Sequence, residues 1–181
     1  MSISEPSEII QLLRGIEQRS RAHAAGLPQQ EEVQQYWEGV VFSLNGAYLA
    51  APLNEVAEIL HFPAVVTHVP GTQPWMQGVA NIRGNLLPIV DLQLFLGGEQ
   101  IIDDRRSRVL IIRRKEVFIG LLVQEVVGMR HIPQHQQIDF PPPNGLMGRF
   151  VKSAFEHDGE TWPVFGMFAL VESKEFQIAA L

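Results

Sequence analysis

Residues 78–92, GVANIRGNLLPIVDL, decide the fold of this chain. Two short apolar runs, VANIR and LLPIVDL, meet at Gly84-Asn85. A two-residue loop with glycine at its first position is typical of a type II′ β-hairpin, so the stretch predicts two antiparallel strands. One permanent cation, Arg83, lies inside this apolar sequence, where an unpaired charge is costly. Arg83 is therefore the first candidate functional residue.

Further pairs of apolar runs flank two-residue turns at Asn45-Gly46, Lys115-Glu116 and Asp158-Gly159. Asn-Gly and Asp-Gly are strong hairpin signals. About eight to ten short strands with this spacing are typical of β-barrels or a β-sandwich. No helical segment long enough for a crossover separates the runs, so a parallel sheet is not expected. The run VFIGLLVQEVVGM predicts one continuous strand.

Two segments near the middle of the chain have weaker patterns. NEVAEIL, residues 54–60, fits a short helix or a strand equally well, because so short a segment has no decisive periodicity. PWMQG predicts one helical turn, since a proline stands at its start and Gly78 at its end.

Residues 1–37 differ from the rest and predict an N-terminal helical extension. Its apolar residues recur at helical spacing and are Ile9, Leu12, Leu13 and Ile16. PQQEEVQQYW, which ends at Trp37, predicts a second short helix. We expect these helices to pack on the main domain, with a separate docking role for the first helix as the alternative. The main domain is expected over 38–172, and a C-terminal tail over 173–181.

Composition excludes several classes of protein. With 46% hydrophobic and 19% charged residues the chain is globular, and its net charge of -6 argues against nucleic acid or an anionic membrane surface as partner. The absence of cysteine excludes disulfides, thiolate nucleophiles and cysteine-ligated metals. No apolar run approaches the roughly 20 residues that span a bilayer, and the N-terminus lacks secretory-signal features. We therefore expect a soluble cytoplasmic protein without direct membrane insertion.

Motifs of catalysis are missing from the sequence. It contains no GxSxG, no GxxxxGK[ST] and no GxGxxG. His131 and His135 have metal-ligand spacing, but a proline between them argues against the required helix, so a metal is not expected. Asp103 and Asp104 are interpreted as a solvated connection, and Asp91 as the cap of the following turn. The sequence therefore predicts neither an enzyme nor a cofactor.

Three ordered motifs resemble the CheW-type coupling domains of chemotaxis. VPGTQPWMQGVANIRGNLLPIVDL is similar to the family signature, in which an Asn-aliphatic-Arg-Gly hairpin precedes an Ile/Val-Asp-Leu strand. VVFSLNGAYLAAPLNEVAEIL resembles the opening strands, and GLLVQEVVGM resembles a later Gly-aliphatic-Val-Asp strand. The resemblance covers about residues 38 to 172. The N-terminal extension and the sequence WPVFGMFALV are most like the type IV pilus branch of the family, PilI.

Two positions depart from the family pattern. Gln124 stands where the family usually has an aspartate, so no charged role carries over to that strand. Near the C-terminus, Phe165-Gly166-Met167 replaces the usual Leu-Asp pattern, which leaves the contacts of the final helix open.

The resemblance implies a mainly β fold of two small five-stranded β-barrels that share one hydrophobic interface. It also implies an adaptor without an active site. Such a protein binds the regulatory domain of a chemotaxis-type histidine kinase and the cytoplasmic tip of a methyl-accepting chemoreceptor, and joins both in a membrane-associated array. For the pilus branch the output is twitching motility. A flagellar coupling protein and a small-ligand-binding β-barrel are the alternatives.

By the same resemblance, Arg83, Glu58 and Val56 face a receptor-binding groove. Glu58 is the expected intramolecular partner of Arg83, and an acidic group of the receptor is the expected intermolecular one. A guanidinium suits this role because its planar fork binds a carboxylate through two hydrogen bonds.

The remaining partner-binding residues implied by the resemblance shape or line this groove. Gly78, Asn81 and Gly84 are expected to shape the hairpin that presents the arginine, and ordinary turn chemistry also accounts for the two glycines. Leu121 and Val123 are expected to contribute to the apolar wall of the groove, although a place in the core is the stronger interpretation for both.

Overall fold

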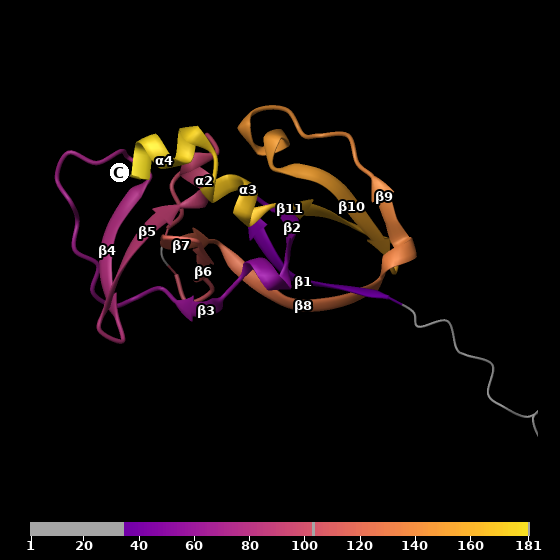
Figure 1. The fold of residues 1–181 in the computed structure, drawn as a ribbon, viewed down its shortest axis with the longest axis horizontal. Helices are drawn as coiled ribbons and strands as arrows, with labels where there is room; N and C mark the ends of the chain where they lie inside the picture. The colour runs from indigo at the N-terminus through magenta and orange to yellow at the C-terminus, as the bar shows by residue number, and fades with distance from the viewer. Residues whose placement is uncertain (1–34, 103, 181) are drawn as a thin grey trace, which may run out of the picture. The chain divides into compact units, whose positions relative to one another are not determined.

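A computed structural model describes residues 35–102 and 104–180 of the chain. The predicted N-terminal helices, up to residue 34, and Asp103 lie outside the described residues. The described part is mainly β, as the sequence predicts, and its strands form two sheets (Figure 1).

The six-stranded sheet has the strand order β8-β1-β2-β11-β10-β9. Its strands are β1 (Tyr36–Leu44), β2 (Ala47–Pro52), β8 (Glu125–Pro133), β9 (Gln137–Asp139), β10 (Val151–His157) and β11 (Glu160–Phe165). The five-stranded sheet has the order β3-β6-β7-β5-β4. Its strands are β3 (Glu58–His61), β4 (Met76–Ile82), β5 (Asn85–Asp91), β6 (Arg108–Arg114) and β7 (Val117–Val123).

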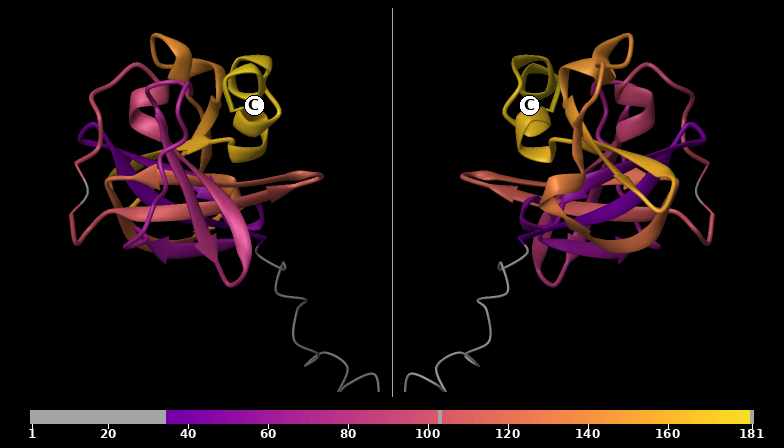
Figure 2. Two further views of the ribbon diagram at one scale, coloured as in Figure 1. Left: turned by 90° about the vertical axis from the view of Figure 1, so that its left-hand side faces the viewer. Right: turned by 90° about the vertical axis from the view of Figure 1, so that its right-hand side faces the viewer.

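Three short helices of the described residues connect or follow the strands, and Figures 1 and 2 show them on one side of the two sheets. They are α2 (Leu92–Phe95), α3 (Met167–Val171) and α4 (Lys174–Ala180). The same part of the chain also contains the 3₁₀ turns η1 (Leu53–Glu55), η2 (Gln134–Gln136) and η3 (Leu146–Arg149). The predicted C-terminal tail thus contains α4, whose Phe176 is buried against Trp75 and Phe95.

The two sheets share one hydrophobic core. Phe42 and Leu49 of the six-stranded sheet and Leu87 and Leu110 of the five-stranded sheet are fully or almost fully buried in the same cluster. Leu170 of α3 belongs to it as well. The predicted apolar interface between two β units is therefore confirmed, with the difference that one sheet has six strands because β9 adds to β10.

The six-stranded sheet has a second core on its other face. Val41 and Phe155 are buried there, together with Trp162. Because successive residues of a strand point to opposite faces, Val41 enters this core while Phe42 enters the shared one. Both faces of the strand are apolar for this reason.

Tyr36 and Trp37 begin β1, so their assignment to the N-terminal helical extension is wrong. They pair with Pro133 and Ile132 of β8, and the Trp37 ring stacks on Phe155 at 4.6 Å. The ladder and the aromatic packing override the weak local helix pattern.

The hairpin predicted at residues 78–92 is present, but its turn lies one residue earlier. Ile82 pairs with Asn85, so the loop is Arg83-Gly84, with φ values of 51° and 84°. Two positive φ values indicate a type I′ turn in place of the predicted type II′. Arg83 therefore lies in the turn and not in the strand.

The run VFIGLLVQEVVGM is two strands. β7 ends at Val123 and β8 begins at Glu125, where the chain crosses from the five-stranded to the six-stranded sheet. Apolar residues continue past the crossing at Val126, Val127 and Met129, so the sequence alone did not mark it.

Two strand pairs are parallel, β5 with β7 and β2 with β11, contrary to the expectation. Parallel strands need a long crossover connection. Between β5 and β7 this connection is made by α2 and β6, so no long helix is needed. Within PWMQG, Pro74 and Trp75 form a turn and Met76 begins β4, with the Met76 N–H donating to the Gln73 carbonyl at 2.9 Å, so the predicted helical turn is wrong. NEVAEIL contains the end of η1 and most of β3.

Candidate functional site

Arg83 and Glu58 form a two-pronged ion pair on the surface of the five-stranded sheet. Arg83 Nη2 lies 2.7 Å from Glu58 Oε1, and Nη1 lies 3.3 Å from Oε2. The Arg83 side chain is 75% exposed and that of Glu58 34%. Solvent therefore screens the pair, and it is a weak source of stability.

This ion pair joins the two ends of the five-stranded sheet. Glu58 lies on β3 and Arg83 in the β4–β5 turn, and β3 and β4 are the first and last strands in the order. The segment between them adds a bridge, in which the Thr67 and Val79 backbones exchange hydrogen bonds of 2.9 and 2.8 Å. The sheet therefore curves until its terminal strands are linked.

Gly78 permits this closure. Its φ is 140°, and a Cβ at this position would lie 2.4 Å from the Thr67 carbonyl oxygen. A larger residue would push the bridging segment away from β4. Gly78 therefore lets the backbone of β4 and the backbone at Thr67 approach each other closely.

The other predicted residues of the hairpin stabilise its turn. The Gly84 N–H donates to Asn81 Oδ1 at 2.9 Å.

Val56, which follows η1, is partly buried and packs against the shared core. Its backbone N–H donates to the Leu53 carbonyl at 3.2 Å.

A hollow of about 240 Å³ adjoins the ion pair. It is lined by Ala57, Glu58, Ile82, Arg83, Asn85, Ile111, Arg113 and Phe118. The guanidinium of Arg113 lies over the Phe118 ring, 4.6 Å from its centroid. Sequence reasoning missed Arg113, although it follows the apolar run VLII just as Arg83 follows an apolar run on β4.

Leu121 and Val123 do not reach this surface. Both side chains are 0% exposed, and Leu122 between them is 1% exposed. β7 lies between β6 and β5 and is covered on both faces, as is usual for a strand with a continuous apolar run. The implied place of Leu121 and Val123 in a groove wall is therefore wrong, and both belong to the core.

Asp91 caps α2, as its position in the sequence predicts. It is fully buried, and it accepts hydrogen bonds from the backbone N–H groups of Leu94 at 2.9 Å and Ile101 at 2.7 Å. Burial raises the pKa of Asp91 above its usual value, and the backbone hydrogen bonds act in the opposite direction. Its two oxygens are used to fix the connection after β5.

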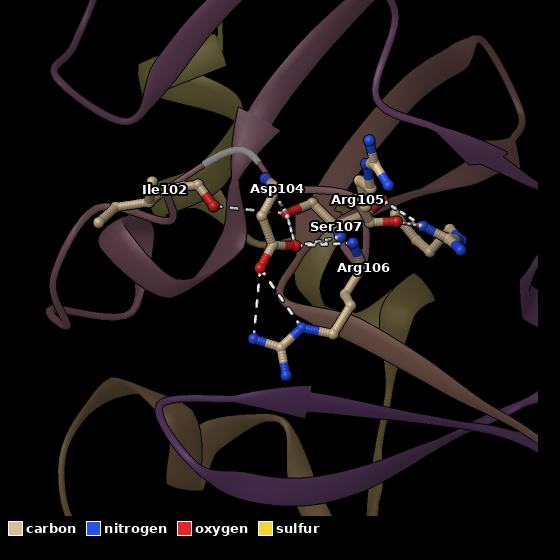
Figure 3. A network of polar contacts seen from close by, with 6 residues as sticks. Ile102, Asp104, Arg105, Arg106 and Ser107 are labelled. Carbon is tan, nitrogen blue, oxygen red and sulfur yellow. Dashed lines mark hydrogen bonds and ion pairs between the residues drawn. The ribbon is translucent and has the colours of Figure 1, made fainter.

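Asp104 also has a local structural role (Figure 3). It accepts backbone hydrogen bonds from Arg106 at 2.7 Å and Ser107 at 3.0 Å, and the Arg106 side chain contacts its other oxygen. The Arg106 backbone hydrogen bond is the main cause that lowers the pKa of Asp104. The charged loop is thus organised around this carboxylate.

Two glutamines hold the β1–β2 turn against the other sheet. The Asn45 N–H donates to Gln93 Oε1 at 2.6 Å, and the Gly46 N–H to Gln124 Oε1 at 3.5 Å. A neutral amide thus occupies the position where the family pattern has an aspartate, at the crossing between β7 and β8.

His131 and His135 lie on β8 and η2, and His131 Nδ1 is 3.1 Å from Glu38 Oε1. No cluster of metal-ligating side chains occurs within residues 35–102 and 104–180. In the same part of the chain, no helix is long and apolar enough to cross a membrane.

The described residues thus form two sheets around a shared core, with an exposed ion pair beside a shallow hollow on the five-stranded sheet. Residues 38–175 match the CheW-like domain. This chain belongs to the CheW-like family.

Individual relatives agree with this assignment. Protein PilI of Pseudomonas aeruginosa is 42% identical over 175 residues, which are 96% of this chain and 97% of PilI. Chemotaxis protein CheW of Thermotoga maritima is 26% identical over 68% of this chain and 80% of its own length. The crystal structure of the scaffolding protein TtCheW from Thermoanaerobacter tengcongensis superimposes with a TM-score of 0.67, covers 78% of this chain and 96% of TtCheW, and at 23% identity shows the fold alone.

Family membership establishes the general role of the chain. It is a non-enzymatic scaffold or coupling protein of the chemotaxis signal-transduction type. The expectation that it is no enzyme is confirmed on this ground.

Proposed function

We propose that this protein is a cytoplasmic adaptor that couples a methyl-accepting chemoreceptor to a chemotaxis-type histidine kinase, in the system that controls type IV pilus twitching motility. One observation carries the pilus assignment. The similarity to PilI covers 96% of this chain and so extends into the region before residue 38, whereas the CheW-like domain itself starts at that residue. The Thermotoga CheW covers only 68% of the chain.

The geometry around Arg83 supports a receptor-binding surface. Its guanidinium is exposed, and the type I′ turn and the Glu58 carboxylate fix its direction. A rigid, partly exposed guanidinium can bind an acidic group of a partner without first losing much conformational freedom. The centre of this surface consists of Arg83, Glu58, Asn81 and Gly84. Val56 lies at its edge, between η1 and Glu58 of β3.

The test is co-purification. The tagged full-length protein is expected to recover a histidine kinase and a methyl-accepting receptor from cells that express both, in the absence of added nucleotide. Arg83→Glu should lose the receptor and retain the kinase, because the substitution places a negative charge beside Glu58. Failure of the parent protein to recover either partner would reject the coupling role.

A flagellar coupling protein is the second candidate, since CheW proteins are among the relatives. The two candidates differ in phenotype. Deletion of the gene should impair twitching on surfaces and leave flagellar swimming intact. The reverse result would assign the protein to flagellar chemotaxis.

A further inference from the structure

Arg113 has no carboxylate partner among the residues that the structure describes. The basic residues in the ion pairs of the described part are Arg83, Arg106, Arg114, Lys115, His131, Arg149 and His157. The Arg113 guanidinium instead lies over the Phe118 ring, 4.6 Å from its centroid. A cation held over an aromatic face keeps its hydrogen-bond donors at its edge available to another molecule.

The hollow between Arg113 and Arg83 carries excess positive charge. Its lining contains two guanidinium groups and one carboxylate, that of Glu58. Both oxygens of Glu58 are used by Arg83. Arg113 is therefore the uncompensated charge of the hollow, and an anionic group is the complementary occupant.

The size of the hollow favours a single side chain as occupant. Its volume of about 240 Å³ lies below the range of about 300–1,000 Å³ that is typical of small-molecule pockets. Ile82 and Phe118 give it apolar walls, and these suit the methylene groups of an acidic side chain. The net charge of -6 argues against a polyanion such as nucleic acid.

We propose that this hollow binds an aspartate or glutamate side chain of the chemoreceptor tip, and that Arg113 binds its carboxylate. The inference rests on the proposed coupling function and adds a second arginine to the receptor-binding surface. Arg83 anchors the surface through Glu58, and Arg113 supplies the free charge. The hollow lies where the β4–β5 turn, β3 and the β6–β7 hairpin meet, so three segments distant in sequence build it.

The experiment measures dissociation constants for two immobilised probes, the cytoplasmic fragment of the receptor and the regulatory domain of the kinase recovered in the co-purification. The full-length protein is compared with Arg113→Gln and Arg113→Lys. Loss of one charged hydrogen bond is expected to weaken receptor binding by Arg113→Gln about tenfold or more. Arg113→Lys should lose less, since it keeps the charge but not the planar fork. Kinase binding and the melting temperature should stay unchanged.

Arg130→Gln is the matched control. Arg130 also lies over an aromatic ring, Trp162, at 5.6 Å, but it belongs to the six-stranded sheet. Its substitution should leave receptor binding unchanged. Reversing acidic residues of the receptor tip to lysine, one at a time, should identify one change that restores binding to Arg113→Glu.

The possible results separate the inference from the proposed function. If the parent binds neither probe, the coupling function fails and the inference with it. If the parent binds the receptor and Arg113→Gln binds it equally well, the inference alone is overturned. An equal loss in Arg130→Gln, or a loss confined to the kinase probe, also overturns it.

Discussion

The carboxylate of Glu55 caps a helix that begins far away in the sequence. Glu55 Oε2 accepts a hydrogen bond from the Phe168 N–H at 3.0 Å, and the two residues are 113 positions apart. Phe168 lies in the first turn of α3, whose N-cap residue, Gly166, has no side chain to offer. A carboxylate at this position satisfies an otherwise free N–H group and interacts favourably with the helix dipole.

A comparison with α2 shows that α3 lacks a side-chain cap from its own N-cap residue. Asp91 caps α2 with its own side chain, at φ −72° and ψ 103°. Gly166 occupies the equivalent place before α3 with nearly the same backbone, φ −80° and ψ 101°. Glu55 therefore supplies from η1 the carboxylate that Gly166 cannot offer. This cap is one contact of the helix after Phe165-Gly166, which the sequence left open.

Glu55→Ala is therefore expected to destabilise the protein by about 1 kcal/mol, the usual effect of removing a helix cap. Gly166→Asp should restore this loss in the Glu55→Ala background, because the backbone at 166 already matches that of Asp91. Denaturant unfolding measures both changes.

The control for the rescue is Gly166→Ala. A Cβ at 166 lies 3.3 Å from the Ala169 Cβ, so either substitution requires a small adjustment. Only the aspartate adds a cap. If Gly166→Asp and Gly166→Ala behave alike in the Glu55→Ala background, capping is not what Glu55 contributes.

A second contact holds α3 to the β6–β7 hairpin. The Arg114 guanidinium lies 4.5 Å from the centroid of the Phe168 ring, and Arg114 and Lys115 approach Glu172 Oε1 at 3.2 and 3.1 Å. Lys115 first, and then Arg114, lower the pKa of Glu172 below its usual value of 4.5. The hairpin and the end of α3 are thus joined by a pH-sensitive contact.

Because the pKa of Glu172 is lower in the folded protein than in the unfolded chain, its contribution is present above pH 4.5 and is lost as the pH falls through the folded value. Glu172→Gln should lower the melting temperature slightly at neutral pH. The difference from the parent should vanish in acid.

Glu116→Gln in the same hairpin is the control for this titration. Glu116 has no ion pair among the described residues, so its substitution should leave the melting temperature nearly unchanged. A difference between parent and Glu172→Gln that persists unchanged in acid would mean that the pair does not stabilise the fold.

The sequence predicted those features that depend on local chemistry. Asn45-Gly46 and Asp158-Gly159 form turns at the predicted positions, with both φ values positive, because these residue types tolerate that conformation. The cap at Asp91 was predicted for a similar reason, as its partner Leu94 is three residues away.

Features that depend on tertiary position could not be predicted in this way. Apolar residues occur on both sides of Gln124, yet the two strands belong to different sheets. The continuous apolar run around Leu121 and Val123 favours the core, but only the central place of β7 excludes both from a groove wall. The contact of Glu55 with α3 joins residues too distant in sequence for any local signal.

The turn at Arg83 combines a feature that the local sequence predicts with one that depends on strand pairing. Gly84 fits the first position of a type II′ loop or the second position of a type I′ loop, and the local sequence allows either. The pairing of Ile82 with Asn85 and the Asn81 hydrogen bond to Gly84 select the second. As a result Arg83 takes a conformation in which arginine is rare.

That conformation gives the sharpest test of why Arg83 is present. Its φ of 51° nearly equals the 50° of Asn45 at the same position of another hairpin. A left-handed backbone costs a non-glycine residue about 1–3 kcal/mol, whereas asparagine tolerates it better. The exposed ion pair with Glu58 stabilises the fold by only about 0.2–1 kcal/mol. Stability alone therefore favours asparagine at 83, and receptor binding is our explanation for the arginine.

Arg83→Asn should accordingly leave the melting temperature unchanged or raise it, while receptor binding is lost and kinase binding is retained. The reciprocal change, Asn45→Arg, places arginine in the same turn conformation without an assigned partner, and it should lower the melting temperature. Thermal unfolding and the two binding measurements, made on the same preparations, decide the question. A loss of more than about 1 kcal/mol in Arg83→Asn would exceed what an exposed pair contributes and would make Arg83 a structural residue. Undiminished receptor binding by a stable Arg83→Asn protein would remove Arg83 from the receptor-binding surface.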